Sequence, residues 1–137
     1  MPAPRFPVSI KGVVLIGGRV VLLKNERDEW ELPGGRLEAG EDPEACLVRE
    51  IAEELSIRVE VGQLLDCWRY AVGVPGARGG EVVIVTYGCR TADRTVTRSA
   101  EHSAAGVFAI DAIDALRMPE GYRRSIRAWQ QLVKAGS

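Results

Sequence analysis

The sequence has little cysteine and histidine. Its 137 residues contain three cysteines and one histidine. The cysteines, Cys46, Cys67 and Cys89, are odd in number and far apart, and no Cys-x-x-Cys pair or Cys/His cluster accompanies them. This pattern excludes a disulfide framework and argues against a structural zinc site. We expect three reduced, buried thiols.

Long apolar runs and an excess of basic charge are also absent. No apolar run approaches the roughly 20 residues that a membrane helix needs, and no apolar signal-peptide segment follows the start at Met1–Arg5. Eighteen basic and nineteen acidic side chains give a net charge of -1, whereas binding a nucleic acid polymer favours a basic excess. We therefore expect a cytoplasmic protein that binds neither a membrane nor a nucleic acid polymer.

The length is that of one domain, residues 1–137. A chain of this size, 46% hydrophobic, buries roughly 65–70% of the surface that it exposes when unfolded, so its core needs no disulfide or zinc. Glycine, with 15 residues, lies above its usual share of about 7%. This favours tight turns and strands over an all-helical bundle.

The first part of the chain is rich in β-formers. The run 13–24 is interrupted only by Gly17-Gly18 and predicts a hairpin. Trp30-Glu31-Leu32 predicts a short strand, which Pro33-Gly34-Gly35 should stop. A loop should continue from there to residue 42.

A helix is predicted next. The carboxylate of Asp42 can cap its first amides, and Pro43 at the first helical position loses no hydrogen bond. Apolar residues then recur at helical spacing, namely Ala45, Val48, Ile51, Ala52 and Leu55. The helix should bury this one stripe.

The rest of the chain predicts further strands and a last helix. Strands are expected over 58–71, 81–87 and 107–110, a loop over 73–80, a helical turn from Asp111 or Asp114, and an amphipathic helix over 122–133. Because helices do not alternate regularly with strands, we expect an α/β fold of the α+β kind, with helices packed on a mixed sheet.

Three carboxylates gather at the end of the first predicted helix. Glu50, Glu53 and Glu54 stand at i, i+3 and i+4, which places them on one side, away from the apolar stripe. They repel one another and face the negative end of the helix dipole, so a positive partner is required. Oxygen ligands suit a hard cation such as Mg²⁺, or Mn²⁺ in its place. The alternative is a solvated acidic face paired with Arg49, Arg58 or Lys24.

The segment Gly35–Ile57 resembles the box of the Nudix hydrolases, whose pattern is G-x5-E-x7-R-E-U-x-E-E-x-G-U with U a bulky aliphatic residue. The matching positions are Gly35, Glu41, Arg49, Glu50, Ile51, Glu53, Glu54 and Ile57. The preceding Trp30–Gly34 also resembles the usual entry to this box. Ser56 stands where the family has glycine, and a left-handed serine there costs up to about 1–2 kcal/mol.

The resemblance implies a fold and an activity. The fold would be an α/β/α sandwich with a mixed β-sheet, in which the box forms a loop-helix-loop. The activity would be Mg²⁺-dependent hydrolysis of the pyrophosphate linkage in a nucleoside diphosphate joined to another moiety, such as a nucleoside triphosphate or ADP-ribose, by attack of water on phosphorus. The alternative is a nucleotide-sensing module with the same fold and no catalysis. Exposed strand edges could pair two copies into a homodimer.

The resemblance also assigns roles within the box. Glu50 and Glu54 correspond to the principal metal ligands, and Glu53 to a further or water-mediated ligand. The backbone carbonyl of Gly35 offers an additional oxygen.

Other roles are less narrowly assigned. The general base varies in the family, so Glu50 or Glu53 is the first candidate and Glu101, outside the box, is another. Arg49 and Glu41 are expected to form an ion pair that holds the loop against the helix.

Arg27 and Tyr70, outside the box, are candidates for substrate binding on weaker grounds, and His102 is not a candidate ligand. Arg27 could reach a phosphate or be a solvated loop arginine. Tyr70 could stack on a base or belong to the core. His102 is expected to be a loop residue and not a metal ligand, because no second imidazole or thiol accompanies it.

Overall fold

The computed structural model describes residues 3, 5–71, 80–100 and 102–136. Its elements in chain order are β1 (Val8–Ile16), β2 (Arg19–Lys24), β3 (Trp30–Glu31), β4 (Gly34–Arg36), α1 (Pro43–Leu55), β5 (Val59–Ala71), β6 (Glu81–Thr91), β7 (Ala104–Phe108), a 3-10 helix (Ile110–Ala115) and α2 (Glu120–Lys134). The loop expected over 73–80 lies outside the described residues except for Gly80. Within the described part, no helix is long and apolar enough to cross a membrane.

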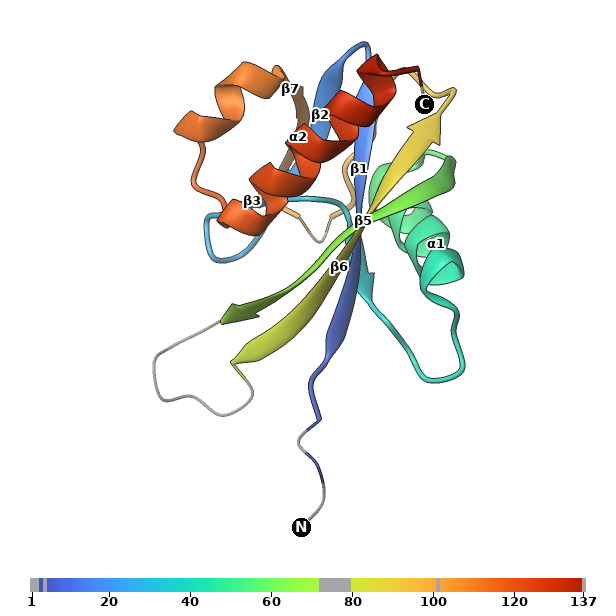
Figure 1. The fold of residues 1–137 in the computed structure, drawn as a ribbon, viewed down its shortest axis with the longest axis vertical. Coiled ribbons are helices and arrows are strands. Elements are labelled where there is room, and N and C mark those ends of the chain that lie inside the picture. The colour runs from blue at the N-terminus through green and yellow to red at the C-terminus, as the bar shows by residue number, and fades with distance from the viewer. Residues whose placement is uncertain (1–2, 4, 72–79, 101, 137) are drawn as a thin grey trace.

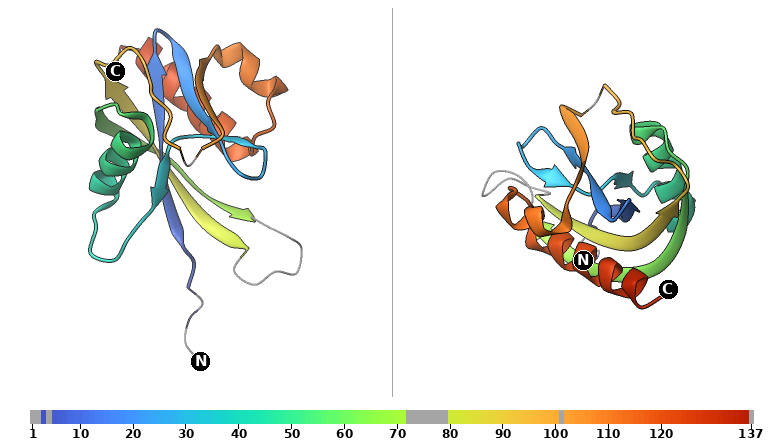
Figure 2. Two further views of the ribbon diagram at one scale, coloured as in Figure 1. Left: turned by 180° about the vertical axis from the view of Figure 1, so that it is seen from behind. Right: turned by 90° about the horizontal axis from the view of Figure 1, so that it is seen from above.

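The strands form one mixed sheet. Its main path runs β3-β2-β1-β6-β5, with β4 added to β1 and β7 added to β2. The β1 and β6 strands are parallel, and the other pairs are antiparallel. Figures 1 and 2 show α1 on one side of the sheet and α2 on the other. The expected α/β/α sandwich with a mixed sheet is confirmed.

Each face of the sheet has its own apolar core. On one face, Ile10 and Val14 of β1 pack with Leu47 and Ile51 of α1. On the other, Val13 of β1 belongs to the cluster that contains the α2 residues, namely Tyr122, Ile126 and Trp129. The alternation of side chains along β1 thus serves both cores, because successive residues of a strand point to opposite faces.

The structure confirms the predicted hairpin but not the whole of the loop predicted after Leu32. Gly17 and Gly18 join β1 to β2 with φ values of 59° and 78°, which confirms the two-residue turn. The loop expected from residue 33 to 42 is wrong at its start, because β4 pairs with β1 there and sets Gly34 opposite Lys11. A bare glycine backbone can pair as a strand where a neighbouring chain supplies the partners, which local composition does not reveal.

The two ends of α1 can be compared with the capping that the sequence predicts. Pro43 is the first helical residue, as predicted, but the side chain of Asp42 accepts no capping hydrogen bond, so that expectation is wrong. Asp42 instead supplies its backbone oxygen to the N–H of Cys46. At the other end, Ser56 is left-handed, with φ 56° and ψ 36°, and its N–H bonds the carbonyl of Ala52.

The cysteines are free, as expected, but not all of them are buried. Cys46 and Cys89 are buried, whereas Cys67 is exposed. Cys67 lies on β5, which is the last strand on its side of the sheet. The expectation of a buried thiol is therefore wrong for Cys67, because an edge strand has fewer neighbours to cover its side chains.

Candidate active site

The site lies where β4 meets the C-terminal half of α1. β4 pairs with β1 in a register that sets Gly35 opposite Ile10. The carboxyl group of Glu50 occupies the space in which a Cβ atom on residue 35 would stand. Glycine at position 35 thus lets the carboxylate of α1 approach the backbone of the strand.

The three glutamates of α1 differ in burial. The side chain of Glu53 is 60% exposed, that of Glu50 is 21% exposed, and that of Glu54 is only 9% exposed. The helical spacing did not predict this burial of Glu54. This residue precedes buried Leu55, and its side chain turns towards β4.

Glu54 is a buried carboxylate with few partners. Its Oε1 accepts a hydrogen bond from the backbone N–H of Gly34 at 2.8 Å, and its Oε2 lies 3.5 Å from Nε2 of His102. Burial raises the pKa of Glu54 to about 7. Lys11, the Gly34 amide and His102 act in the opposite direction, and Glu50 adds to the rise. The positive charge nearby does not offset the loss of water around this group.

Arg49 ties α1 to the loop before it. Its Nε and Nη2 donate to the two carboxylate oxygens of Glu41 at 2.8 and 3.1 Å, a two-point contact that suits the planar guanidinium. Its Nη1 lies 3.1 Å from an oxygen of Glu50 and 3.5 Å from Glu53. One side chain therefore fixes the loop and partly neutralises two of the three glutamates.

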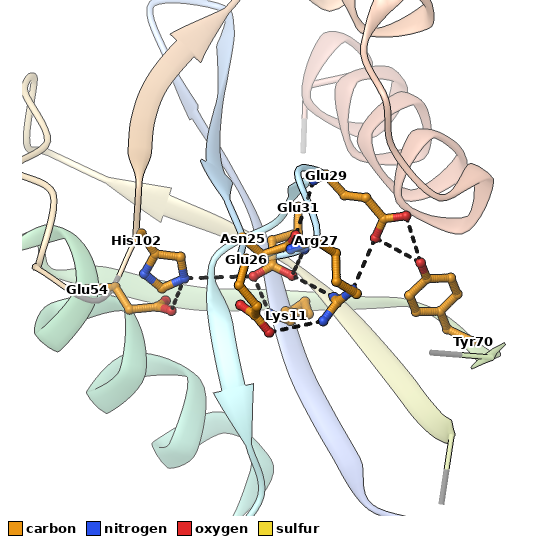
Figure 3. A network of polar contacts seen from close by, with 9 residues as sticks. All are labelled: Lys11, Asn25, Glu26, Arg27, Glu29, Glu31, Glu54, Tyr70 and His102. Atoms are coloured by element: carbon orange, nitrogen blue, oxygen red, sulfur yellow. Dashed lines mark hydrogen bonds and ion pairs between the residues drawn. The ribbon is translucent and has the colours of Figure 1, made fainter. Parts of the chain in front are cut away.

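A second polar cluster lies beside these carboxylates, and Figure 3 shows that His102 joins the two. At its centre, Oε2 of Glu31 accepts a hydrogen bond from Nδ2 of Asn25 at 3.0 Å. The ammonium group of Lys11, the guanidinium of Arg27 and the imidazole Nε2 of His102 each lie 3.8 Å from a carboxylate oxygen of Glu31. Burial acts to raise the pKa of Glu31, but these partners lower it to about 2.

Arg27 and Tyr70 are linked through Glu29. The hydroxyl of Tyr70 lies 2.8 and 2.9 Å from the two carboxylate oxygens of Glu29 and donates to this group. Nε of Arg27 lies 3.4 Å from Glu29. The side chain of Arg27 is 33% exposed. Arg27 is thus held by neighbouring carboxylates and is not a freely solvated loop residue.

These two residues also line a pocket of about 190 Å³ together with Lys11, Glu31 and Gly35. The pocket begins at the glycine that contacts Glu50 and runs to Tyr70 on β5. The structure therefore brings the two expected substrate contacts together and joins their pocket to the box.

Comparison with known proteins decides the family. The NUDIX domain family matches residues 7–129. The chain is also 34% identical over 135 residues to a MutT-like protein of Streptomyces ambofaciens, an alignment that covers 97% of this chain and 81% of that protein. The chain belongs to the NUDIX family.

Two further matches agree with this assignment. The chain is 54% identical over 37 residues to an 8-oxo-dGTP diphosphatase of Proteus vulgaris, a match that covers 27% of this chain and 33% of that protein. The crystal structure of a MutT NUDIX hydrolase from Burkholderia pseudomallei superposes with a TM-score of 0.76 and 26% identity, over 91% of this chain and 98% of that one. The chain is a NUDIX enzyme of the nucleotide pyrophosphohydrolase type.

The loop before β7 holds His102, which the sequence predicted as a loop residue but whose contacts it did not predict. Glu101 lies outside the described residues, but its neighbour His102 is a loop residue whose ring contacts Glu54 and Glu31. Glu31 raises the pKa of His102, burial acts against this, and Glu54 adds to the rise. Periodicity does not say where a loop side chain points. The only available hint was a lone histidine next to Glu101.

The donor set of the NUDIX site bears on whether it fits a divalent cation. In the described part of the chain, no three Asp, Glu, His or Cys side chains stand as a group that could hold a metal. An oxygen of Glu50 contacts Arg49, and an oxygen of Glu54 accepts a hydrogen bond from the Gly34 amide. The donors near the buried carboxylate of Glu54 are nevertheless oxygens, which are the ligands that a hard cation prefers.

Proposed function

We propose that this NUDIX enzyme hydrolyses the pyrophosphate linkage of a nucleoside triphosphate or another nucleoside-diphosphate derivative, such as ADP-ribose, with Mg²⁺ as cofactor. The observation that carries this proposal is Glu54, a carboxylate buried beside Glu50 with its pKa raised to about 7. Such a group costs stability when it is ionised, and a bound cation would compensate for that cost. The name of the Proteus vulgaris relative supports a nucleoside triphosphate as substrate.

The residues that would hold the cation are Glu50, Glu53, Glu54 and the backbone carbonyl of Gly35. Mn²⁺ could replace Mg²⁺, because both accept oxygen ligands. When bound, such a cation supplies positive charge for the diphosphate and makes water easier to deprotonate.

The remaining chemistry falls to the side chains. Glu50 or Glu53 would accept the proton of the water that attacks phosphorus, with Glu101 as the candidate outside the box. Arg49 holds Glu50 and Glu53 through one guanidinium and is itself fixed by Glu41. The carboxylates are thereby kept near their working positions before substrate arrives.

The test is release of phosphate or pyrophosphate from a panel of nucleoside triphosphates and diphosphate-linked compounds, with Mg²⁺, with Mn²⁺ and with chelator. We expect turnover of one class that chelator abolishes. Glu53→Gln and Glu54→Gln should each abolish it and leave the fold intact, whereas Glu44→Gln, in the exposed first turn of the same helix, should retain it.

Two results would contradict the proposal. Full activity of both Glu53→Gln and Glu54→Gln would remove the metal assignment. No turnover of any compound, with nucleotides still protecting the fold against heat, would favour the nucleotide-sensing alternative. Location in the cytoplasm and pairing into a homodimer stay predictions, and light scattering in solution tests the second.

A further inference from the structure

The ammonium group of Lys11 has no role in the proposed reaction. Lys11 lies on β1 directly opposite Gly34, the residue before the box, and its side chain is only 9% exposed. The nearest carboxylate oxygen to its Nζ, on Glu31, lies 3.8 Å away, which is an ion-pair distance longer than a hydrogen bond. An ammonium group carries three donors. Because Lys11 lines the pocket, its donors can reach an acceptor on a bound ligand.

The pocket has the size and surface of a site for one ring system. Its volume of about 190 Å³ is below the roughly 300–1,000 Å³ of sites that enclose a whole drug-sized ligand. Val82 and Ile84 of β6 give it an apolar side, and Tyr70 and Tyr122 add aromatic rings. Since one end is Gly35 of the box, a diphosphate bound at the box would direct its nucleoside into this pocket.

The charged groups of the pocket divide into hydrogen-bond donors and a hydrogen-bond acceptor. Lys11 and Arg27 are donors only, whereas Glu31, whose pKa is about 2, is an acceptor only. Figure 3 shows Lys11 and Arg27 both contacting Glu31. The pocket thus presents a donor and an acceptor side by side, 3.8 Å apart.

We infer that Lys11 determines base specificity by donating a hydrogen bond to the 6-carbonyl oxygen of an oxopurine, while Glu31 accepts one from the adjacent ring N–H. The inference rests on the proposed function, because it places the diphosphate at the box. It assigns the substrate class as guanine or hypoxanthine nucleotides. Glu31 would at the same time keep Lys11 charged and in place.

The chemistry of the bases excludes the aminopurine. Guanine carries an acceptor oxygen at position 6, and lysine and arginine are its commonest specific partners, whereas adenine carries an amino donor there. An amino group set against Lys11 would leave two buried donors without an acceptor, which is costly. A site built around such hydrogen bonds discriminates strongly against the wrong partner.

The experiment measures the binding of GMP, IMP and AMP by calorimetry, with no hydrolysis involved. We expect GMP and IMP to bind at least about 10-fold more tightly than AMP. Lys11→Met should weaken the binding of GMP and IMP by about 10- to 100-fold and leave the binding of AMP unchanged. The matched control is Lys134→Met, in the exposed last turn of α2, which should bind all three as the native protein does.

Three results would overturn the inference: equal binding of GMP and AMP, an equal loss for all three nucleotides in Lys11→Met, or no binding of GMP. An equal loss would indicate a contact to phosphate.

If Lys11→Met does not fold because Glu31 loses its partner, the double variant Lys11→Met/Glu31→Leu removes both charges and should show the same loss of preference. A base preference without turnover of any nucleotide would refute only the proposed hydrolysis, and turnover without a base preference would refute only the role of Lys11.

Discussion

The pocket and the box each bury one carboxylate against the same imidazole, Glu31 on the pocket side and Glu54 on the box side. Their pKa values move in opposite directions, to about 2 for Glu31 and to about 7 for Glu54. Burial acts to raise both. At Glu31, the partners Lys11, His102, Asn25 and Arg27 together outweigh burial. At Glu54, Lys11, the Gly34 amide and His102 act in the same direction but do not outweigh it, and the neighbouring Glu50 adds to the rise.

The two carboxylates differ in whether neighbouring groups of the protein compensate for their negative charge. Glu31 has its counter-charges within the protein, so it contributes to the stability of the fold. Glu54 costs stability when it is ionised, and in the proposed metal site a cation would compensate for its charge. Two buried glutamates in one region can therefore be told apart by what surrounds them, one as part of the scaffold and one as part of the proposed metal site.

The strongest test of this comparison is the stability of Glu31→Gln. The pKa of Glu31 is lowered from 4.5 to about 2, which corresponds to about 3 kcal/mol of folding free energy at neutral pH. This contribution is complete above the unfolded pKa and is lost as the pH falls from about 5 to 2. Glu31→Gln should therefore be about 3 kcal/mol less stable at pH 7, and the gap should narrow on acidification. Urea unfolding between pH 3 and 8 measures it.

Glu54→Gln should give the opposite result in the same experiment. Its raised pKa means that the folded state holds the proton more tightly, so native stability falls as the pH rises from about 4.5 to 7. In the presence of chelator, Glu54→Gln should be more stable than the native protein at pH 8, by about 3 kcal/mol. Its amide oxygen can still accept the bond from Gly34. Equal losses in Glu31→Gln and Glu54→Gln would show that the two carboxylates play the same role.

The contact between Gly35 and Glu50 tests how much the box depends on position. In Gly35→Ala the added Cβ would collide with the Glu50 carboxyl group, and displacement of a reacting group by about 1 Å costs about 100-fold in rate. We expect this loss in metal-dependent turnover. Gly106→Ala is the control, because its Cβ would meet only the ring of Phe108, at 3.4 Å. Native turnover in Gly35→Ala would show that Glu50 does not act from its present place.

The two sides of the comparison also differ in how far the sequence predicts them. The box is local: the spacing of the glutamates on α1 and the Arg49–Glu41 contact lie within one short segment, and periodicity is sufficient to place them. Even there, the burial of Glu54 was not predicted, because it depends on the pairing of β4 with β1. The hairpin at Gly17-Gly18 was predicted because its turn chemistry is local as well.

The pocket could not be predicted in this way. Its residues come from β1, β3, β4, β5, β6, α2 and the loop of Arg27, so no spacing along the chain reveals that they meet. In the sequence, Lys11 reads as an ordinary polar residue of a strand. Only the fold shows that its Nζ lies 3.8 Å from Glu31. The contacts of His102 with Glu31 and Glu54 were not predicted for the same reason. Long-range pairing decides these neighbours, and one sequence alone does not report it.

The smallest expected effect concerns Ser56, at the end of the helix that carries Glu54. Ser56 is held in the left-handed conformation, which glycine adopts without the clash of a Cβ atom. Ser56→Gly should therefore raise the free energy of unfolding by about 1 kcal/mol, and Ser56→Ala, which keeps the Cβ, should not. The gain should be the same at pH 5 and pH 8, because no titrating group changes. A pH-dependent gain would instead mean that the helix end and the ionisation of Glu54 are coupled, and the cost now assigned to burial would then lie partly in the backbone.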